Sequence, residues 1–116
     1  MEAKELRIGN YVYSNKFVIK SYGVDGFINI LKNIDNFTPI PLTEEWLLKF
    51  GFEENCNNNY QISYNQVCGL SITISDYKSW FCNLSSTTFY ELSNCKHVHQ
   101  LQNLYFTLTN EELIIK

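Results

Sequence analysis

One cysteine and two histidines occupy alternate positions near the end of the chain, as Cys95-x-His97-x-His99. Thiolate and imidazole are both ligands of Zn²⁺, and on an extended segment the three side chains would share one face. On a helix, residues two apart point about 200° apart and cannot converge. Because the apolar stripe that begins at Val98 predicts a helix, we expect His97 and His99 on different sides of its first turn, where they cap, pack or hydrogen-bond. The sequence therefore predicts no metal site.

Further polar side chains flank the same predicted helix. Gln102, Asn103 and Tyr105 could form a polar patch beside His99. One interpretation is a ligand site where this helix meets the preceding strands, with rings available for stacking. The favoured interpretation is structural: a solvated helix face, or amides that hydrogen-bond the backbone of an edge strand. The candidate ligand-binding residues of the first interpretation are His99, Gln102, Asn103, Tyr105, Trp80, Tyr90, Lys96 and Arg7.

Patterns that are typical of catalysis are missing from the sequence. It has no Gly-x-Ser-x-Gly elbow, no motif that marks a cysteine as activated, and no phosphate-binding loop among its five glycines. Adjacent carboxylates at the start of a helix usually complement the helix dipole. Such pairs occur at Glu44-Glu45, Glu53-Glu54 and Glu111-Glu112. We therefore expect a protein that is not an enzyme, with no catalytic residue and no cofactor.

The composition indicates a globular protein of one domain. The 116 residues carry a formal net charge of -3, and 45% of them are hydrophobic. An acidic chain with a single arginine, Arg7, lacks the basic field of a nonspecific nucleic-acid binder, so nucleic acid is an unfavoured partner. No stretch reaches the roughly 20 apolar residues of a membrane span, and Met1–Glu5 does not resemble a signal peptide. We expect a cytoplasmic protein that does not bind a membrane.

Four cysteines are spaced almost evenly along the second half of the chain. Cys56, Cys68, Cys82 and Cys95 contain no CxxC pair and match no zinc-site pattern. In the cytoplasm such thiols remain reduced. Their spacing is typical of one cysteine on each of several successive strands, so we expect buried thiols that behave as small hydrophobic side chains.

The N-terminal 40 residues are predicted to form short strands. Residues 6–13 and 17–22 form two of them around the turn pair Ser14-Asn15. The Asp-Gly pair at residues 25–26 predicts a hairpin turn, and residues 27–31 a further strand. Three or four strands with tight turns suggest a small, strongly bent sheet, of which an SH3-like half-barrel is one version.

A helix is predicted in the middle of the chain. Prolines at positions 39 and 41 end the preceding sheet, and Thr43 is placed to cap a helix over residues 44–50. Gly51 supplies the left-handed residue that follows the helix. Residues 53–59 are rich in asparagine and are predicted to form a polar loop.

An antiparallel β-meander and a helix complete the predicted α+β fold. Residues 60–92 alternate with period two over four strands. In the helix, Val98, Leu101, Leu104 or Tyr105, and Leu108 form one apolar stripe that is predicted to cover the meander. Residues 113–115 could add a short strand. The predicted single domain spans residues 1–116, with N-terminal strands in 1–40, a helix in 41–52, the meander in 60–92 and the C-terminal helix in 97–108.

Three stretches of the sequence carry a resemblance. They are residues 6–12 (LRIGNYV), 41–52 (PLTEEWLLKFGF) and 99–106 (HQLQNLYF). The chain resembles short proteins encoded by bacteriophages and mobile elements of Bacteroidales-type gut bacteria. The match covers the two ends and the middle helix, and its motifs carry no recognised chemistry. The resemblance implies an accessory phage protein that works in the cytoplasm of the bacterial host.

The preferred functional hypothesis is binding to a host protein, as an inhibitor of a defence or regulatory factor, with a homo-oligomer as the expected assembly. An alternative is sequestration of a small nucleotide-like signalling molecule, with aromatic and asparagine side chains on the base. Lys20, Lys78 and Lys96 would then face the phosphates. A second alternative is nucleic-acid binding by the N-terminal strands, which the acidic balance of the chain disfavours.

Overall fold

A computed structural model describes residues 6–14, 17–20, 23–56, 59–63, 68–83, 88–92 and 94–115. The chain divides into two compact units. We call Met1–Pro41 with His97–Glu112 the N-terminal unit, and Leu42–Lys96 with Leu113–Lys116 the sheet unit. The single domain expected from the sequence stays a prediction.

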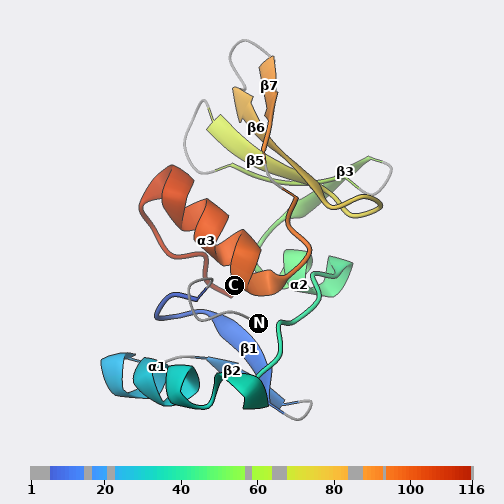
Figure 1. The fold of residues 1–116 in the computed structure, drawn as a ribbon. Helices are drawn as coiled ribbons and strands as arrows, with labels where there is room; N and C mark the ends of the chain where they lie inside the picture. Colours follow the sequence, from blue (N-terminus) through green and yellow to red (C-terminus); the bar gives the residue numbers. More distant parts are fainter. Residues whose placement is uncertain are drawn as a thin grey trace. The chain divides into compact units, whose positions relative to one another are not determined.

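The predicted α+β class is confirmed (Figure 1). The described elements include a two-stranded sheet, a five-stranded antiparallel sheet and three α-helices. In chain order they are β1 (Tyr11–Ser14), β2 (Phe17–Lys20), α1 (Gly23–Lys32), the 3₁₀ turn η2 (Ile34–Asn36), α2 (Glu44–Lys49), β3 (Glu53–Cys56), β4 (Asn59–Ser63), β5 (Cys68–Thr73), β6 (Lys78–Asn83), β7 (Thr88–Glu91) and α3 (Val98–Thr109). No helix in these ranges combines the length and the apolar character that crossing a membrane requires.

The sheet of the N-terminal unit is a hairpin of β1 and β2. The strands pair antiparallel, with Tyr11 opposite Lys20 and Ser14 opposite Phe17. On the other edge of β1, Thr38 exchanges two backbone hydrogen bonds with Tyr13, each of 2.9 Å. Asn15 and residues 21–22, which the sequence assigned to the first turn and the second strand, lie outside the described residues, as do residues 1–5.

Helix α1 replaces a strand that the sequence predicted. The turn at residues 25–26 and the strand at residues 27–31 are wrong, because Gly23–Lys32 is helical. Phe27, Ile30 and Ile34 recur at helical spacing and pack with Leu6 and Val12 in one core cluster. A short apolar run fits either periodicity, and burial of this face selects the helix. Over the described residues, the N-terminal sheet therefore has two strands and one bridge, not the three or four strands of an SH3-like half-barrel.

Helix α2 of the sheet unit confirms the predicted caps. The Thr43 hydroxyl accepts a hydrogen bond of 3.4 Å from the N–H of Trp46, and two glutamates occupy the first turn. Gly51 has a φ of +92°, in the left-handed region. The N–H groups of Gly51 and Phe52 both donate to carbonyls of the last helical turn, at 3.0 Å, which is the Schellman arrangement.

The larger sheet is a meander in which five strands follow one another in sequence order. The four predicted strands of residues 60–92 are present as β4 to β7. The polar loop predicted at residues 53–59 is wrong over Glu53–Cys56, which forms β3 and pairs with β4. Glu53 and Glu54 are both exposed, so this stretch has no apolar alternation that would predict a strand. Tyr60, Leu70 and Ile72 are fully buried and share one face of this sheet.

Helix α3 belongs to the N-terminal unit, where it contacts β1. Val98, Leu101 and Tyr105 are buried, so the predicted apolar stripe is confirmed at these positions, with Tyr105 as the buried one of the two alternatives. Leu108, its last predicted member, is only half-buried. The helix ends at a left-handed residue, Asn110, with φ +59°. Residues 113–115 form no strand. The expected covering of the meander by this helix stays a prediction.

Candidate functional site

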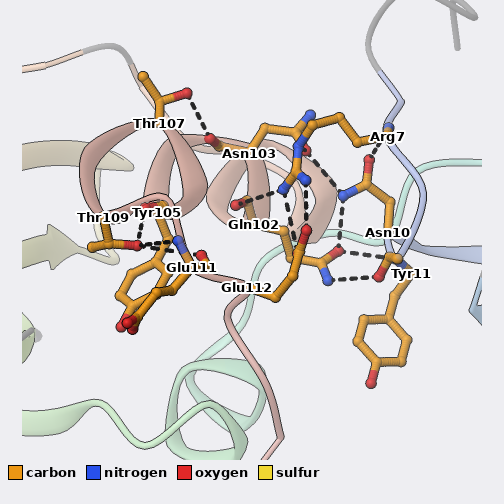
Figure 2. Close-up of polar contacts among 11 residues, drawn as sticks. Arg7, Asn10, Tyr11, Gln102, Asn103, Tyr105, Thr107, Thr109, Glu111 and Glu112 are labelled. Atoms are coloured by element: carbon orange, nitrogen blue, oxygen red, sulfur yellow. Dashed lines mark hydrogen bonds and ion pairs between the residues drawn. The ribbon is translucent and has the colours of Figure 1, made fainter.

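The side chain of Gln102 closes the outer edge of β1 (Figure 2). Its Oε1 accepts a hydrogen bond of 2.9 Å from the N–H of Tyr11, and its Nε2 donates one of 3.1 Å to the carbonyl of Gly9. A side-chain amide offers an acceptor and donors much as a peptide group does. Gln102, which is only 1% exposed, therefore takes the place that a neighbouring strand would occupy on β1. This is the geometry of the structural interpretation, in which amides on this helix hydrogen-bond the backbone of an edge strand.

Arg7 is held by several groups of the same unit. Its Nε donates to Oδ1 of Asn103 at 2.9 Å, and its Nη1 lies 2.7 Å from Oε1 of Glu112. Its Nη2 donates to the backbone carbonyl of Gln102 at 3.2 Å. The guanidinium also lies over the ring of Phe106, 4.3 Å from the ring centroid. The rigid fork of arginine suits such a set of acceptors, which lysine could not satisfy in the same way.

Asn10 links Arg7 to the two amides of α3. Its Nδ2 donates to Oδ1 of Asn103 at 3.0 Å, and its Oδ1 accepts from the backbone N–H of Arg7 at 2.6 Å. The turn between them contains Gly9, whose φ of +98° favours glycine. We refer to the set as the Arg7 cluster, which consists of Arg7, Asn10, Gln102, Asn103 and Glu112 (Figure 2).

Sequence reasoning identified part of this cluster and missed the rest. Arg7, Gln102 and Asn103 were candidate residues, and the structure brings them together. Asn10 and Glu112 were missed. Residues 6–12 and 99–106, which are far apart in the sequence, meet in this cluster, where each stretch supplies hydrogen-bond partners to the other.

The two histidines do not lie on different sides of the first helical turn, so that expectation is wrong. Their rings stack, with centroids 5.8 Å apart and an interplanar angle of 16°. His97 is the N-cap of α3 and has extended backbone angles, so the 100° step per residue of a helix does not apply to it. Its N–H donates to Oε1 of Gln100 at 3.1 Å. His99 is buried, with 1% exposure.

Cys95 is a buried thiol, as predicted. Burial raises its pKa to about 11, and a hydrogen bond with Ser79 opposes part of that rise. The side chains of Cys56, Cys68 and Cys82 lie outside the described residues. Their backbones belong to β3, β5 and β6, and Cys95 lies on no strand, so the predicted pattern of successive strands is wrong. Among the side chains that the structure describes, no three of His, Cys, Asp and Glu could hold a metal ion together.

The remaining candidate residues are divided between the units. Trp80, Tyr90 and Lys96 belong to the sheet unit, where Tyr90 is exposed and lies against Phe81 with ring centroids 6.1 Å apart. Tyr105 belongs to the N-terminal unit with the Arg7 cluster. Burial and then the charge of Glu111 raise the pKa of its hydroxyl.

Sequence reasoning did not single out the surface around β2. Within the ranges that the structure describes, β2 pairs with β1 and with no other strand. Phe17 is 73% exposed and Val18 46% exposed, on a strand of only four residues. We call this strand the β2 edge. Edge strands with exposed apolar side chains are templates for pairing with another chain.

Further apolar side chains are exposed in the same unit. Helix α1 buries Ile30 and packs Phe27 against the core, while Val24 and Ile28, one turn apart, are exposed on its flank. Five of the nine large hydrophobic side chains that are exposed among the described residues lie between positions 8 and 28. Exposed apolar side chains are therefore more frequent in this part of the sequence than in the rest of the described chain.

Comparisons of the chain with protein-family models, with curated proteins and with solved structures find no match.

Proposed function

We propose that this chain is a non-enzymatic binding protein that recognises a host protein through the β2 edge. The observation that carries the proposal is the difference between the two edges of one small sheet. Gln102 and Thr38 occupy the outer edge of β1. The β2 edge instead presents Phe17 and Val18 to solvent. An extended segment of a partner can add to such an edge, with backbone hydrogen bonds for affinity and side chains for specificity.

The edges of the larger sheet are less suited to this role. Strand β3 carries Glu53 and Glu54 and has a register irregularity, and β7 ends in Glu91. Charged residues and bulges are the usual protection of an edge strand against pairing. The β2 edge has no register irregularity and a single charged residue, Lys20, at its end. It also has an aromatic residue, Phe17, of the kind that anchors protein interfaces.

The hydrogen bonds of the Arg7 cluster favour protein binding over the nucleotide alternative. Arg7, Gln102 and Asn103 already bond to one another or to the backbone. A polar ligand would have to replace these bonds, each of which contributes about 1 kcal/mol net to stability. The role as a phage accessory protein rests on the sequence resemblance, which supplies the host protein as the partner.

The test is affinity capture with tagged full-length protein from a lysate of a Bacteroidales gut bacterium. Val18→Asp places a charge on the β2 edge, and Leu48→Asp makes the same change at an exposed position on α2. We expect the wild-type chain and Leu48→Asp to retain the same host protein, and Val18→Asp to bind the purified partner at least about tenfold more weakly. Circular dichroism controls for folding. If wild type retains nothing, or Val18→Asp binds equally well, the proposal is wrong.

A further inference from the structure

We propose that the segment recognised by the β2 edge is extended and acidic, and that it adds to β2 as a strand with a carboxylate close to Lys20. This inference rests on the proposed function and specifies the chemistry of its partner. Three properties of the N-terminal unit support it: the direction of the β2 backbone groups, the side chains on the outer face of the hairpin, and the local charge.

The backbone of β2 is oriented for strand addition at Val18. Both the N–H and the C=O of Tyr13 bond to Thr38, on the side of β1 away from β2. Tyr13 and Val18 are opposite each other in the register, so they form a pair without mutual hydrogen bonds. The N–H and C=O of Val18 consequently point away from β1, toward the position that an added strand would take.

The face of the hairpin opposite the core carries the side chains that the added strand would meet. Val12 and Ile19 pair across the hairpin and belong to the core cluster. Because side chains alternate along a strand, Val18 and Lys20 share the opposite face with Tyr11. The Lys20 ammonium lies over the Tyr11 ring, 5.4 Å from its centroid. A neighbouring strand would place its own side chains beside Val18 and Lys20.

The stretch of sequence that contains β2 is basic, in a chain that is acidic as a whole. Residues 6–24 contain three basic residues and no aspartate or glutamate, whereas the whole chain has a net charge of -3. Of these basic residues, Lys20 lies on β2 itself. Asp25, in the first turn of α1, is the first acidic residue that follows. A carboxylate on the partner strand complements this charge.

Two other occupants fit less well. The β2 edge of a second copy carries another Lys20 and no carboxylate, so it offers no charge that complements Lys20. A nucleic acid offers phosphates to Lys20 but no alternating backbone donors and acceptors for Val18. An acidic peptide satisfies both requirements.

The probe is a fluorescein-labelled octapeptide of alternating glutamate and valine, and its counterpart has lysine in place of glutamate. Binding to the full-length protein is measured by fluorescence anisotropy at low and physiological salt. We expect the acidic peptide to bind, more tightly at low salt, and the basic peptide to bind at least tenfold more weakly. Hydrogen exchange at the Val18 amide should slow when the acidic peptide is bound.

Three variants locate the binding. Lys20→Glu should weaken acidic-peptide binding about tenfold, whereas Lys32→Glu, the same change on α1, should leave it unchanged. Val18→Pro removes an N–H that points away from β1, so the hairpin bonds remain, and binding should be lost. Circular dichroism confirms folding of each variant. Equal binding of both peptides, or of wild type and Lys20→Glu, overturns the inference.

The outcomes separate this inference from the proposed function. If a host protein is captured in a Val18-dependent way but Lys20→Glu does not weaken its binding, the proposed function is supported and the inference of an acidic segment is wrong. If wild type captures no host protein, both the proposed function and the inference are wrong. A dimer by light scattering that Val18→Pro abolishes would assign the edge to a second copy, and competition by oligothymidylate but not by the acidic peptide would assign it to nucleic acid. Either result overturns the inference.

Discussion

Replacing Gln102 by leucine tests whether its amide closes the edge of β1. Leucine is close in size to glutamine but has no donor or acceptor. Gln102→Leu leaves the N–H of Tyr11 and the C=O of Gly9 without the partner that the structure provides. Loss of each of these two part-buried hydrogen bonds costs about 2 kcal/mol, and burial of the more apolar side chain returns about 1 kcal/mol. We expect the free energy of unfolding to fall by about 3 kcal/mol.

The assay is urea unfolding followed by circular dichroism, with Thr107→Val as the matched control. Thr107 is exposed on the same helix, and its hydroxyl donates to the carbonyl of Asn103, one turn earlier. Removal of that exposed hydroxyl should change the free energy of unfolding by no more than about 0.5 kcal/mol. For a domain of this size, a loss of 3 kcal/mol corresponds to a fall in Tm of roughly 10 °C. A loss below about 1 kcal/mol, or equal to that of the control, would refute the bridging role of Gln102.

Three further predictions follow from other contacts. Gly51→Ala should lower the free energy of unfolding by about 1 kcal/mol in urea titrations, because Gly51 has a φ of +92°. A thermal-shift screen with mono-, di- and cyclic nucleotides should leave Tm unchanged, because the Arg7 cluster is bonded within the protein; a shift that the variant Arg7→Lys abolishes would contradict this. Burial raises the pKa of Cys95 from 9.0 to about 11. The resulting stability is present below pH 9 and is lost as pH rises toward 11, so wild type should lose about 1 kcal/mol more than Cys95→Ala between pH 8 and pH 10 in urea unfolding.

Helix α2 and helix α1 show what could be predicted from the sequence. The ends of α2 depend on local signals, because a capping threonine and a left-handed glycine act on backbone groups a few residues away. In residues 23–31 the local signals point elsewhere, since glycines and an Asp-Gly pair are typical of turns. The helix there is selected by contacts of Phe27 and Ile30 with Leu6 and Val12, which no local pattern contains.

The same distinction applies to the candidate site. The amides on α3 could be identified from their place beside an apolar stripe. Their partners could not, because Gln102 and Tyr11 are 91 residues apart in the chain. Nor does a hairpin sequence indicate which of its two edges stays open. That depends on the hydrogen bonds of Thr38 and Gln102 with β1. These contacts are not encoded locally, so the open β2 edge could be identified only from the structure.

The difference between the two edges limits how many partners the hairpin can take. A ribbon with two open edges is bivalent, and strands added on both sides could propagate into a polymer. Because Gln102 and Thr38 occupy the β1 side, the hairpin has a valence of one. Strand addition at β2 then ends with a complex of one chain to one segment. Gln102→Leu should lower stability without making the hairpin bivalent, because Thr38 keeps both of its hydrogen bonds to Tyr13.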